Sequence, residues 1–434
     1  MRPLPSAAAA CAAAWLAACA PSLPPAPADP SSASGSPAPI AEDSGTVPEP
    51  VGAPGDEGGI RFQIIYVIHG DGGYVWYDDS GARREADREA LAQARATARA
   101  ADAAEVFIFH QRPTRFLRFF HGSDGTLWQY RRGRLIRKVP YDRRLAHRLG
   151  AGASARPTRA GLDRERGPDA REDGGLDAEA ALFARFASRP APRRCALPAA
   201  RGASASRPAR IFCYFGHGIP VTGKAAYFRS RPDVAVSISG FARALVRFGG
   251  PACPPSKPFS LVVLSACHGG TPEATLALAP YADWILASPG ELHLSYLETR
   301  ALGRLARDAS RPADAGTMGM WARALAEESF ARLGRSVRTG VSIALYETSR
   351  SEPYLRDRIG AWAVGERAFP GAPLLREEPS AYRDCGENPA FGPGGEEAGV
   401  LLFYRPPRFG IDKGKAAHSG WECPETDPRS ASAG

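Results

Sequence analysis

The stretch FSLVVLSACHGGTPE, residues 259–273, decides the fold of this chain. It opens with an apolar run of the kind found in a strand that is buried on both faces of a parallel sheet. The run ends before Ser265, and Thr271 with Pro272 then supplies an N-cap and a first helical residue. The sequence therefore predicts a buried strand, a short loop that carries Cys267, and a helix.

The same pattern occurs earlier, in ARIFCYFGHG, residues 209–218, where a buried strand is followed by a glycine-flanked histidine. Because the carboxyl ends of adjacent parallel strands meet at one edge of a sheet, we expect His217 and Cys267 to lie close together. A neighbouring imidazole can deprotonate a thiol and later protonate a leaving amine. The backbone N–H groups of Gly218 and Cys267 could then form an oxyanion hole.

Further elements extend this pattern. The run FQIIYVI, residues 62–68, predicts a strand that ends at His69, and a helix over 85–103 and a strand over 105–109 follow it. Other predicted elements are a hairpin over 126–139, helices over 176–187, 239–248 with Ser239 as N-cap, 295–308 and 317–334, and strands over 284–288, 341–346 and 399–404. The sequence predicts an α/β fold with a mostly parallel sheet sandwiched by helices.

Two segments carry a resemblance to a known family. A strand before His-Gly and a second strand before Ala-Cys, 50 residues later, resemble the caspase-like cysteine peptidases. Residues 264–273, LSACHGGTPE, and 279–288, APYADWILAS, resemble the clostripain family more closely, best over about 209–300. This resemblance implies a caspase–haemoglobinase-like fold. It also implies a cysteine endopeptidase that forms a thioester acyl-enzyme on Cys267, with His217 as general base and acid.

The chain departs from the family pattern at one substrate-binding position. Clostripain-like enzymes usually have an aspartate two residues before the cysteine, where it helps to bind a basic side chain, and this chain has Ser265. Glu291, in the loop after the next strand, offers another carboxylate. With His69 at the edge of the cleft, these residues are the candidate substrate-binding groups, and cleavage after a basic residue is the default expectation.

The resemblance also implies two finer properties. Family members are often processed internally, and the basic residues suited to this are Lys224, Arg229 and Arg231. The family often needs calcium, and the candidate ligands are Asp71, Asp78, Asp79 and Glu105. The sequence contains no recognisable calcium loop. It also contains no CxxC pair and no HExxH motif, so we expect no structural zinc site.

The N-terminal segment predicts export. Residues 1–18 have a basic start and a short apolar stretch, which is typical of a secretory signal and too short to span a bilayer. With the next residue they form LAAC, residues 16–19, which resembles the lipobox of bacterial lipoproteins and implies cleavage before Cys19 and its acylation. Ala20 follows, and the absence of an aspartate there favours the outer membrane of the cell envelope, facing the periplasm or the outside.

Differences in amino-acid composition divide the rest of the chain into a tether and a catalytic domain with an insertion. Residues 19–58 are rich in proline and alanine and are expected to be a disordered tether, before a catalytic domain over 59–434. Within that domain, residues 148–208 are expected to be a flexible insertion, helical only near its middle.

The eight cysteines leave few possible bridges. Cys213 lies in an apolar run and is predicted to be a buried free thiol. An exported protein can form disulfides, and Cys195, Cys253, Cys385 and Cys423 could form up to two, with open connectivity.

Alternative functions remain at this point. Hydrophobic residues make up 44% of the chain and charged residues 23%, so a sizeable core is possible. The net charge of +9 is spread along the chain, which favours a solvated surface and a protein or peptide substrate rather than nucleic acid. Glu273 is interpreted as a helix-start residue stabilised by the dipole. The alternatives to a peptidase are a catalytically inactive caspase-like scaffold that acts as a surface binding module, and a protease restricted to one partner protein.

Overall fold

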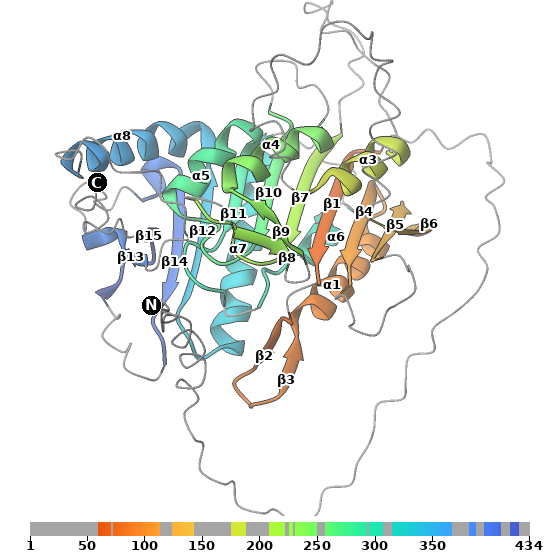
Figure 1. Cartoon of the computed structure of the whole chain (residues 1–434), viewed down its shortest axis with the longest axis horizontal. Coiled ribbons are helices and arrows are strands. Elements are labelled where there is room, and N and C mark those ends of the chain that lie inside the picture. Colours follow the sequence, from red (N-terminus) through yellow and green to blue (C-terminus); the bar gives the residue numbers. More distant parts are fainter. Residues whose placement is uncertain are drawn as a thin grey trace, which may run out of the picture. The chain divides into compact units, whose positions relative to one another are not determined.

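A mixed sheet lies at the centre of the structure, which is a computed structural model (Figure 1). Its strands are β1 (Phe62–His69), β4 (Ala104–Gln111), β5 (Gly125–Arg131), β6 (Arg134–Tyr141), β7 (Ala209–Phe215), β10 (Phe259–Ser265), β11 (Ala282–Ala287), β12 (Val341–Glu347) and β14 (Val400–Arg405). Among the described residues they form one nine-stranded sheet in the order β14-β12-β11-β10-β7-β1-β4-β5-β6. The central strands β11, β10, β7, β1 and β4 are parallel, and the pairings beyond them at both edges are antiparallel.

The structure describes part of the chain. The described residues are 60–70, 73–112, 124–142, 175–187, 208–221, 225–228, 231–249, 257–292, 295–305, 307, 315–366, 382–387, 395–408 and 417–424. The predicted signal segment, the tether, Cys19, Asp71, Lys224, Arg229, Cys195, Cys253 and most of 148–208 lie outside them.

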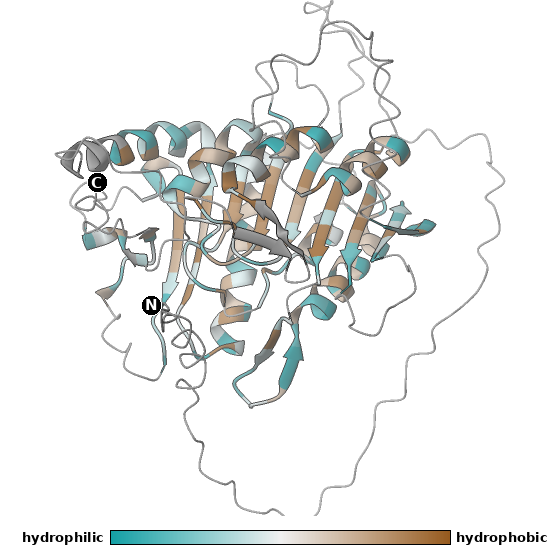
Figure 2. Ribbon diagram, in the orientation of Figure 1, coloured by the Kyte–Doolittle hydropathy of each residue, from teal (hydrophilic) through white to brown (hydrophobic). Residues whose placement is uncertain are grey.

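Helices cover both faces of the sheet. One hydrophobic core lies under α1 (Ala86–Ala100), α6 (Ala301–Leu305) and α7 (Ala315–Ser336). A second core lies under α3 (Asp177–Phe186), α4 (Ile238–Gly249), α5 (Pro272–Leu278) and α8 (Thr348–Glu366). Figure 2 shows that the most hydrophobic residues concentrate in the strands between these helices. The predicted α/β class, a mostly parallel sheet sandwiched by helices, is confirmed.

Smaller pairs of strands flank the main sheet. They are β2 (Val75–Tyr77) with β3 (Arg83–Glu85), β8 (Ala225–Phe228) with β9 (Arg231–Val236), and β13 (Tyr382–Asp384) with β15 (Glu422–Pro424). Short 3-10 helices lie at Ala279–Tyr281, Cys385–Glu387 and Glu396–Ala398.

The apolar runs of the sequence become strands because both of their faces are buried. Every residue of β1 is buried, and successive side chains enter opposite cores. Ile65 and Val67 pack in the core under α4, whereas Ile64 and Tyr66 pack in the core under α1. A strand between two cores needs apolar residues at every position, which is why these runs lack alternation.

Tertiary hydrogen bonds shorten one predicted helix. The helix expected over 295–308 is helical only from Ala301 to Leu305. The N–H groups of Leu297 and Glu298 donate to Ser265 Oγ at 3.0 Å and to Ser329 Oγ at 2.9 Å. Because these N–H groups donate to serine hydroxyls of other elements, they are not available for helical hydrogen bonds. The backbone before Ala301 is therefore held in a non-helical conformation.

The N-cap of α4 is also not the predicted one. The N–H of Gly240 donates to Ser237 Oγ at 3.1 Å, so Ser237 caps the helix and the expectation of Ser239 is wrong. Both serines precede the apolar face, and only the backbone turn decides which hydroxyl reaches a free N–H.

Helix α3 lies inside the predicted insertion and confirms the helix expected there. Its Phe183 packs edge-on against Phe107 of β4 and tilted against Phe248 of α4, and Asp177 pairs with Arg247. This part of the insertion is therefore integrated in the core under α4.

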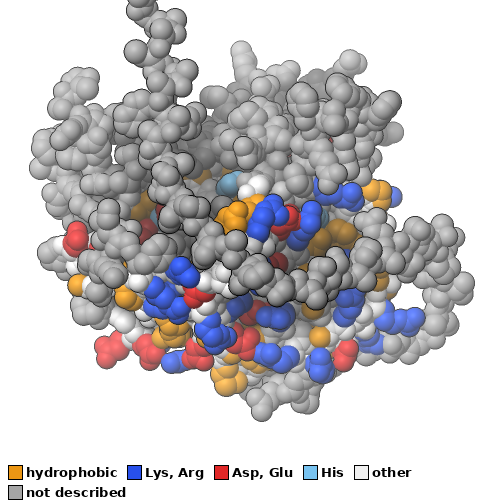
Figure 3. Space-filling view, turned by 90° about the horizontal axis from the view of Figure 1, so that it is seen from below, with side chains coloured by type: hydrophobic (Ala, Val, Ile, Leu, Met, Phe, Trp, Pro, Cys, Tyr) orange, Lys and Arg blue, Asp and Glu red, His pale blue; other side chains and the backbone are white. Residues whose placement is uncertain are grey.

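Two surface observations complete the description. On the face seen in Figure 3, basic and acidic side chains are interspersed rather than gathered into one patch of a single sign. Within the described residues, the helices are all too short or too polar to cross a bilayer.

We expect Phe248→Ala to destabilise the protein strongly. Phe248 is fully buried and contacts Phe109, Phe183 and Phe212. Truncation of such a side chain costs about 3–5 kcal/mol, because the cavity collapses only in part. Urea unfolding followed by circular dichroism measures this loss. The matched control is Val246→Ala on the same helix, where the side chain is 40% exposed and the expected change is below about 0.5 kcal/mol.

Candidate active site

The register of two neighbouring strands places the predicted histidine and cysteine at the same level. Strands β7 and β10 are parallel, and Phe215 is the direct partner of Ser265. His217 and Cys267 each lie two residues beyond this pair, at the carboxyl edge of the sheet. Both residues are partly exposed, so a substrate can reach them.

The His217 ring is positioned by an aromatic residue from another loop. Tyr74 lies between β1 and β2, and its ring centroid is 4.8 Å from that of His217, with 38° between the planes. Tyr74 also packs edge-on against Phe215. Because it is almost fully buried, Tyr74 supports the imidazole from the protein side.

Tyr214 connects the histidine loop to the end of β1. Its hydroxyl donates to the His217 carbonyl at 3.4 Å and lies 3.4 Å from Nδ1 of His69. His69 is buried beneath this loop rather than exposed at the edge of a cleft. The structure therefore places His69 near the candidate site as a supporting residue.

Backbone groups surround the Cys267 thiol. The Leu292 N–H donates to Sγ at 3.4 Å. Gly218 lies against the Cys267 backbone, since a Cβ on Gly218 would be 3.0 Å from the Cys267 carbonyl oxygen and 3.7 Å from its Cβ. The Gly218 N–H donates no hydrogen bond within the described part of the chain, so it can serve an oxyanion.

His268 has a different set of contacts from His217. Its Nδ1 lies 3.1 Å from Oε2 of Glu422, and its ring stacks on Tyr382 with centroids 3.6 Å apart. Its backbone is left-handed, with φ of 55°. These contacts turn the imidazole toward the C-terminal segment, as expected for a neighbour of the nucleophile that is not its base.

Ser265 has a structural contact in place of the family's aspartate. Its side chain is buried, and its hydroxyl accepts a hydrogen bond from the Leu297 N–H. Ser265 also lines a small cavity with Gln93, Tyr296 and Thr299. Serine brings no negative charge to this cavity.

Two carboxylates, Glu291 and Glu298, lie in the segment between β11 and α6. Glu298 is ion-paired with Arg300 at 2.7 Å. Burial opposes its ionisation, but hydrogen bonds from Arg300 and Gln93 lower the pKa of Glu298 below its ordinary value. Glu291 is exposed and precedes Leu292, whose N–H faces the thiol. Of the two, Glu291 is the carboxylate that solvent and substrate can reach.

The described candidate calcium ligands, Asp78, Asp79 and Glu105, each bond different partners. Asp78 accepts a hydrogen bond from Ser80 and forms an ion pair with Arg84. Asp79 forms ion pairs with Arg338 and Arg408. Glu105 accepts hydrogen bonds from Gln63 and Gln129. Within the described residues no three acidic, histidine or cysteine side chains come close enough to hold a metal ion. These residues therefore do not fit a calcium site.

The described cysteines divide into two thiols and one disulfide. Cys213 and Cys267 are thiols, and burial raises the pKa of Cys213 far above its ordinary value, which makes it unreactive. The buried free thiol predicted at Cys213 is thus confirmed. Cys385 and Cys423 form a disulfide, so one of the open connectivities is settled.

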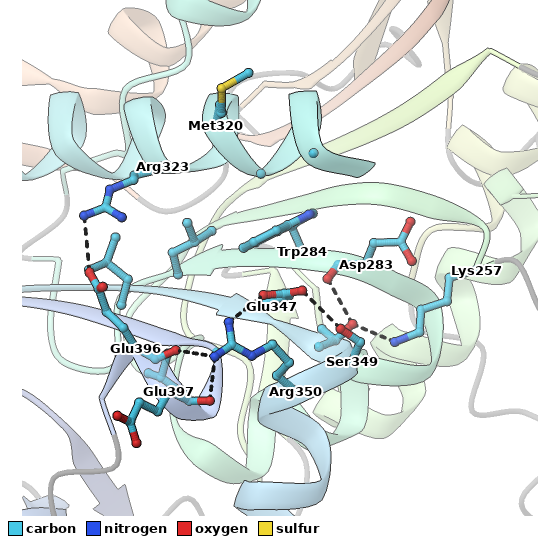
Figure 4. A pocket seen from close by; sticks show the side chains of 17 residues that line it. Lys257, Asp283, Trp284, Met320, Arg323, Glu347, Ser349, Arg350, Glu396 and Glu397 are labelled. Carbon is cyan, nitrogen blue, oxygen red and sulfur yellow. Dashed lines mark hydrogen bonds and ion pairs between the residues drawn. The ribbon is translucent and has the colours of Figure 1, made fainter. Parts of the chain in front are cut away.

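A further groove lies away from these residues. Figure 4 shows it beside the first half of α7, with Trp284 and Met320 at its walls. Its volume is about 830 Å³. Several of its charged side chains have partners within the groove, as Arg350 does with Glu347 and the carbonyls of Glu396 and Glu397, and Lys257 with the Thr348 hydroxyl. The groove contains neither a nucleophile nor a base from the candidate pair.

Sequence reasoning identified the histidine, the cysteine and the glycine, but it missed their supports. Tyr74 lies in a loop whose sequence has no helical or strand periodicity. Tyr214 cannot be distinguished by sequence from the other residues of a buried strand. Leu292 acts through its backbone N–H, which any residue except proline offers. No local signal could have identified these three residues.

Comparison with known proteins adds the following findings. No protein-family model and no curated protein matches the chain. A secreted C11 cysteine protease from Bacteroides thetaiotaomicron, in complex with an irreversible peptide inhibitor, is 12% identical with a TM-score of 0.39, covering 69% of this chain and 70% of that one. A second structure of a secreted C11 protease from that organism is 10% identical with a TM-score of 0.40, covering 71% of each chain. An inactive zymogen C11 protease from Parabacteroides distasonis is 12% identical with a TM-score of 0.38, covering 70% of this chain and 65% of that one.

Glu273 differs in part from its sequence-based interpretation. It lies in the first turn of α5, where the helix dipole favours a charged carboxylate. Burial outweighs the dipole and raises the pKa of Glu273 to about 7. Glu273 is thus a helix-start residue, as predicted, but burial favours its protonated form over the charged form that the dipole would stabilise.

We expect Glu273→Gln to stabilise the protein at alkaline pH. The folded state holds the proton up to about pH 7, whereas the unfolded chain releases it near 4.5. The wild type therefore loses stability as pH rises between these values, by about 3 kcal/mol in total. Urea unfolding at pH 4, 6 and 8 should show equal stability of wild type and variant at pH 4. The gap should then grow up to pH 8, and a gap independent of pH would contradict this assignment.

Proposed function

We propose that this protein is a cysteine endopeptidase with Cys267 as nucleophile and His217 as general base and acid. The observation that carries the proposal is the paired register of β7 and β10, which brings a partly exposed imidazole and a partly exposed thiol to one edge of the sheet. The close packing of Gly218 against Cys267 supports it further, since a Cβ added to Gly218 would lie 3.0 Å from the Cys267 carbonyl oxygen.

Each group has a role that follows from its surroundings. His217 takes the thiol proton, and the Cys267 sulfur attacks the scissile carbonyl to form a thioester, while the imidazolium returns the proton to the leaving amine. The Gly218 N–H, with that of Cys267, stabilises the oxyanion of the tetrahedral intermediate. Water then hydrolyses the thioester with His217 as base. The Leu292 N–H stabilises the thiolate before attack.

We expect Cys267→Ala and His217→Ala to abolish peptide hydrolysis, each lowering kcat at least about 10³-fold, because neither group acts without the other. Residues 59–434 are assayed with a mixed fluorogenic peptide pool, and circular dichroism confirms folding. The matched control is Cys213→Ala, which removes the buried thiol and should leave kcat within about threefold. Equal activity of all folded variants would overturn the proposal.

The same assay tests the finer parts of the proposal. We propose a preference for a basic residue before the scissile bond, recognised by the exposed Glu291 instead of Ser265, whose hydroxyl already bonds Leu297. Cleavage sites in the pool, identified by mass spectrometry, should then lie after arginine or lysine. Glu291→Gln should weaken this preference. Self-processing after Lys224, Arg229 or Arg231 would appear as two fragments in the wild type and one chain in Cys267→Ala.

The assay also separates the peptidase from a catalytically inactive binding module. A peptide-derived thiol-reactive inhibitor should label Cys267 at a much higher rate than free cysteine, because it uses the substrate site and the polarised thiol. Labelling no faster than free cysteine, together with the absence of hydrolysis, would favour the binding module.

We further propose that the chain is an exported lipoprotein, anchored through Cys19 in the bacterial cell envelope, in the outer membrane. The LAAC sequence at residues 16–19 supports this proposal.

We expect the full-length chain, expressed in a Gram-negative host with an alkynyl fatty acid, to incorporate the label and to sediment with membranes. Cys19→Ala should remove the label. Cys11→Ala is the matched control, since Cys11 lies within the predicted signal segment, and it should keep the label. Label that persists in Cys19→Ala would contradict the anchor.

A further inference from the structure

Two short C-terminal segments form a unit, which we call the staple, defined as residues 382–387 and 417–424. Strands β13 and β15 pair antiparallel within it, and the Cys385–Cys423 disulfide joins its two segments. Asp384 adds hydrogen bonds from the N–H groups of Gly386 and Ser419, both at 2.8 Å. The staple therefore has internal bonds that do not depend on the main sheet.

The staple contacts the residue that follows the candidate nucleophile. Tyr382 stacks on the His268 ring with 2° between the planes, and Glu422 Oε2 lies 3.1 Å from His268 Nδ1. The His268 N–H donates to the Gly290 carbonyl at 3.0 Å. Gly290 itself lies against the staple, because a Cβ there would be 3.2 Å from Glu422 Oε1.

A second contact reaches Gly270 in the same loop. Trp421 Nε1 donates to the Tyr346 hydroxyl at 2.5 Å, and this hydroxyl donates to the Gly270 carbonyl at 2.5 Å. Ser342, on the same strand as Tyr346, donates to the Gly420 carbonyl. The staple thus contacts the loop that carries Cys267 directly at His268, and reaches Gly270 through the Tyr346 hydroxyl of β12.

The backbone of His268 explains why such support is needed. Its φ of 55° lies in the left-handed region, which is unfavourable for a residue with a Cβ, although histidine tolerates it better than most. A conformation of this kind persists only where the surrounding structure holds it. The turn at His268 orients the preceding peptide group, so it also sets the direction of Cys267 and of its carbonyl against Gly218.

We propose that the staple positions the Cys267 nucleophile by holding His268 in its left-handed conformation. Glu422 and Tyr382 are positioning residues in this proposal, acting through His268, and the disulfide maintains their geometry. The proposal rests on the proposed peptidase function and adds to it a determinant that lies more than 100 residues away from the nucleophile in the sequence.

The test exploits the conformational freedom of glycine. Glycine adopts positive φ without penalty, so His268→Gly supplies the required turn without the staple. We expect Glu422→Gln, and the double variant Cys385→Ala/Cys423→Ala, to lower kcat about tenfold with little change in KM. In the His268→Gly background the same changes should lower kcat less than twofold. His268→Ala, which keeps the strain and loses the contacts, should be less active than His268→Gly.

The controls separate positioning from general destabilisation. Glu387→Gln alters an exposed carboxylate of the staple and should leave kcat unchanged. Thermal unfolding shows whether each variant folds. Equal losses from Glu422→Gln in the wild-type and His268→Gly backgrounds, or His268→Ala as active as His268→Gly, would overturn the proposal.

Hydrogen exchange gives a second readout that does not require catalysis. The N–H groups of His268 and Gly270 bond the carbonyls of Gly290 and Ser288, so exchange in a peptide spanning 266–271 reports the state of the loop. Faster exchange in Glu422→Gln, but not in Glu387→Gln, supports the staple even if the wild type shows no hydrolysis. If the wild type shows no hydrolysis but exchange is faster in Glu422→Gln, only the proposed peptidase function is contradicted. Unchanged exchange in Glu422→Gln would contradict the proposed role of the staple.

Discussion

The parallel pairing of β7 with β10 is the constraint on which the rest of the candidate site depends. Phe215 and Ser265 are direct partners, and the backbone continues from each into a glycine-containing turn. A register shifted by one residue would exchange the two faces of β10 and turn apolar side chains away from their cores. The burial of both strands therefore determines the height at which His217 and Cys267 leave the sheet.

Close backbone packing above this edge determines the side chains allowed there. A Cβ at Gly216 would collide with the Tyr214 hydroxyl, and one at Gly270 would lie 2.9 Å from the backbone nitrogen of Pro289. The glycines in both loops thus permit close approach of the chain to neighbouring elements, rather than serving only as hinges. His268 is different, because it adopts a left-handed turn with a full side chain. This exception to the local rules is found directly beside the candidate nucleophile, where strain with a structural support is often functional.

Burial also controls which titratable groups can take part in chemistry. Cys213 and Cys267 carry the same functional group in different surroundings. Desolvation raises the pKa of the Cys213 thiol, whereas the Cys267 thiol is partly exposed and lies beside the Leu292 N–H. Glu273 and Glu291 differ in the same way, since Glu273 is buried and holds its proton to about pH 7 while Glu291 is exposed. Position in the fold, more than residue type, separates the accessible thiol and carboxylate from the buried ones.

The sequence by itself determined the class of fold and the candidate catalytic pair, because both depend on local patterns. A continuous apolar run, a glycine-flanked polar residue and a helix cap are written in adjacent residues, and parallel topology brings similar strand ends together. Only the tertiary structure decided that Leu297 and Glu298 donate to serines of other elements instead of forming a helix, that Tyr74 supports His217, and that Glu422 reaches His268. These contacts join residues far apart in the chain, and a side chain's partner across such distances depends on packing that no local pattern encodes.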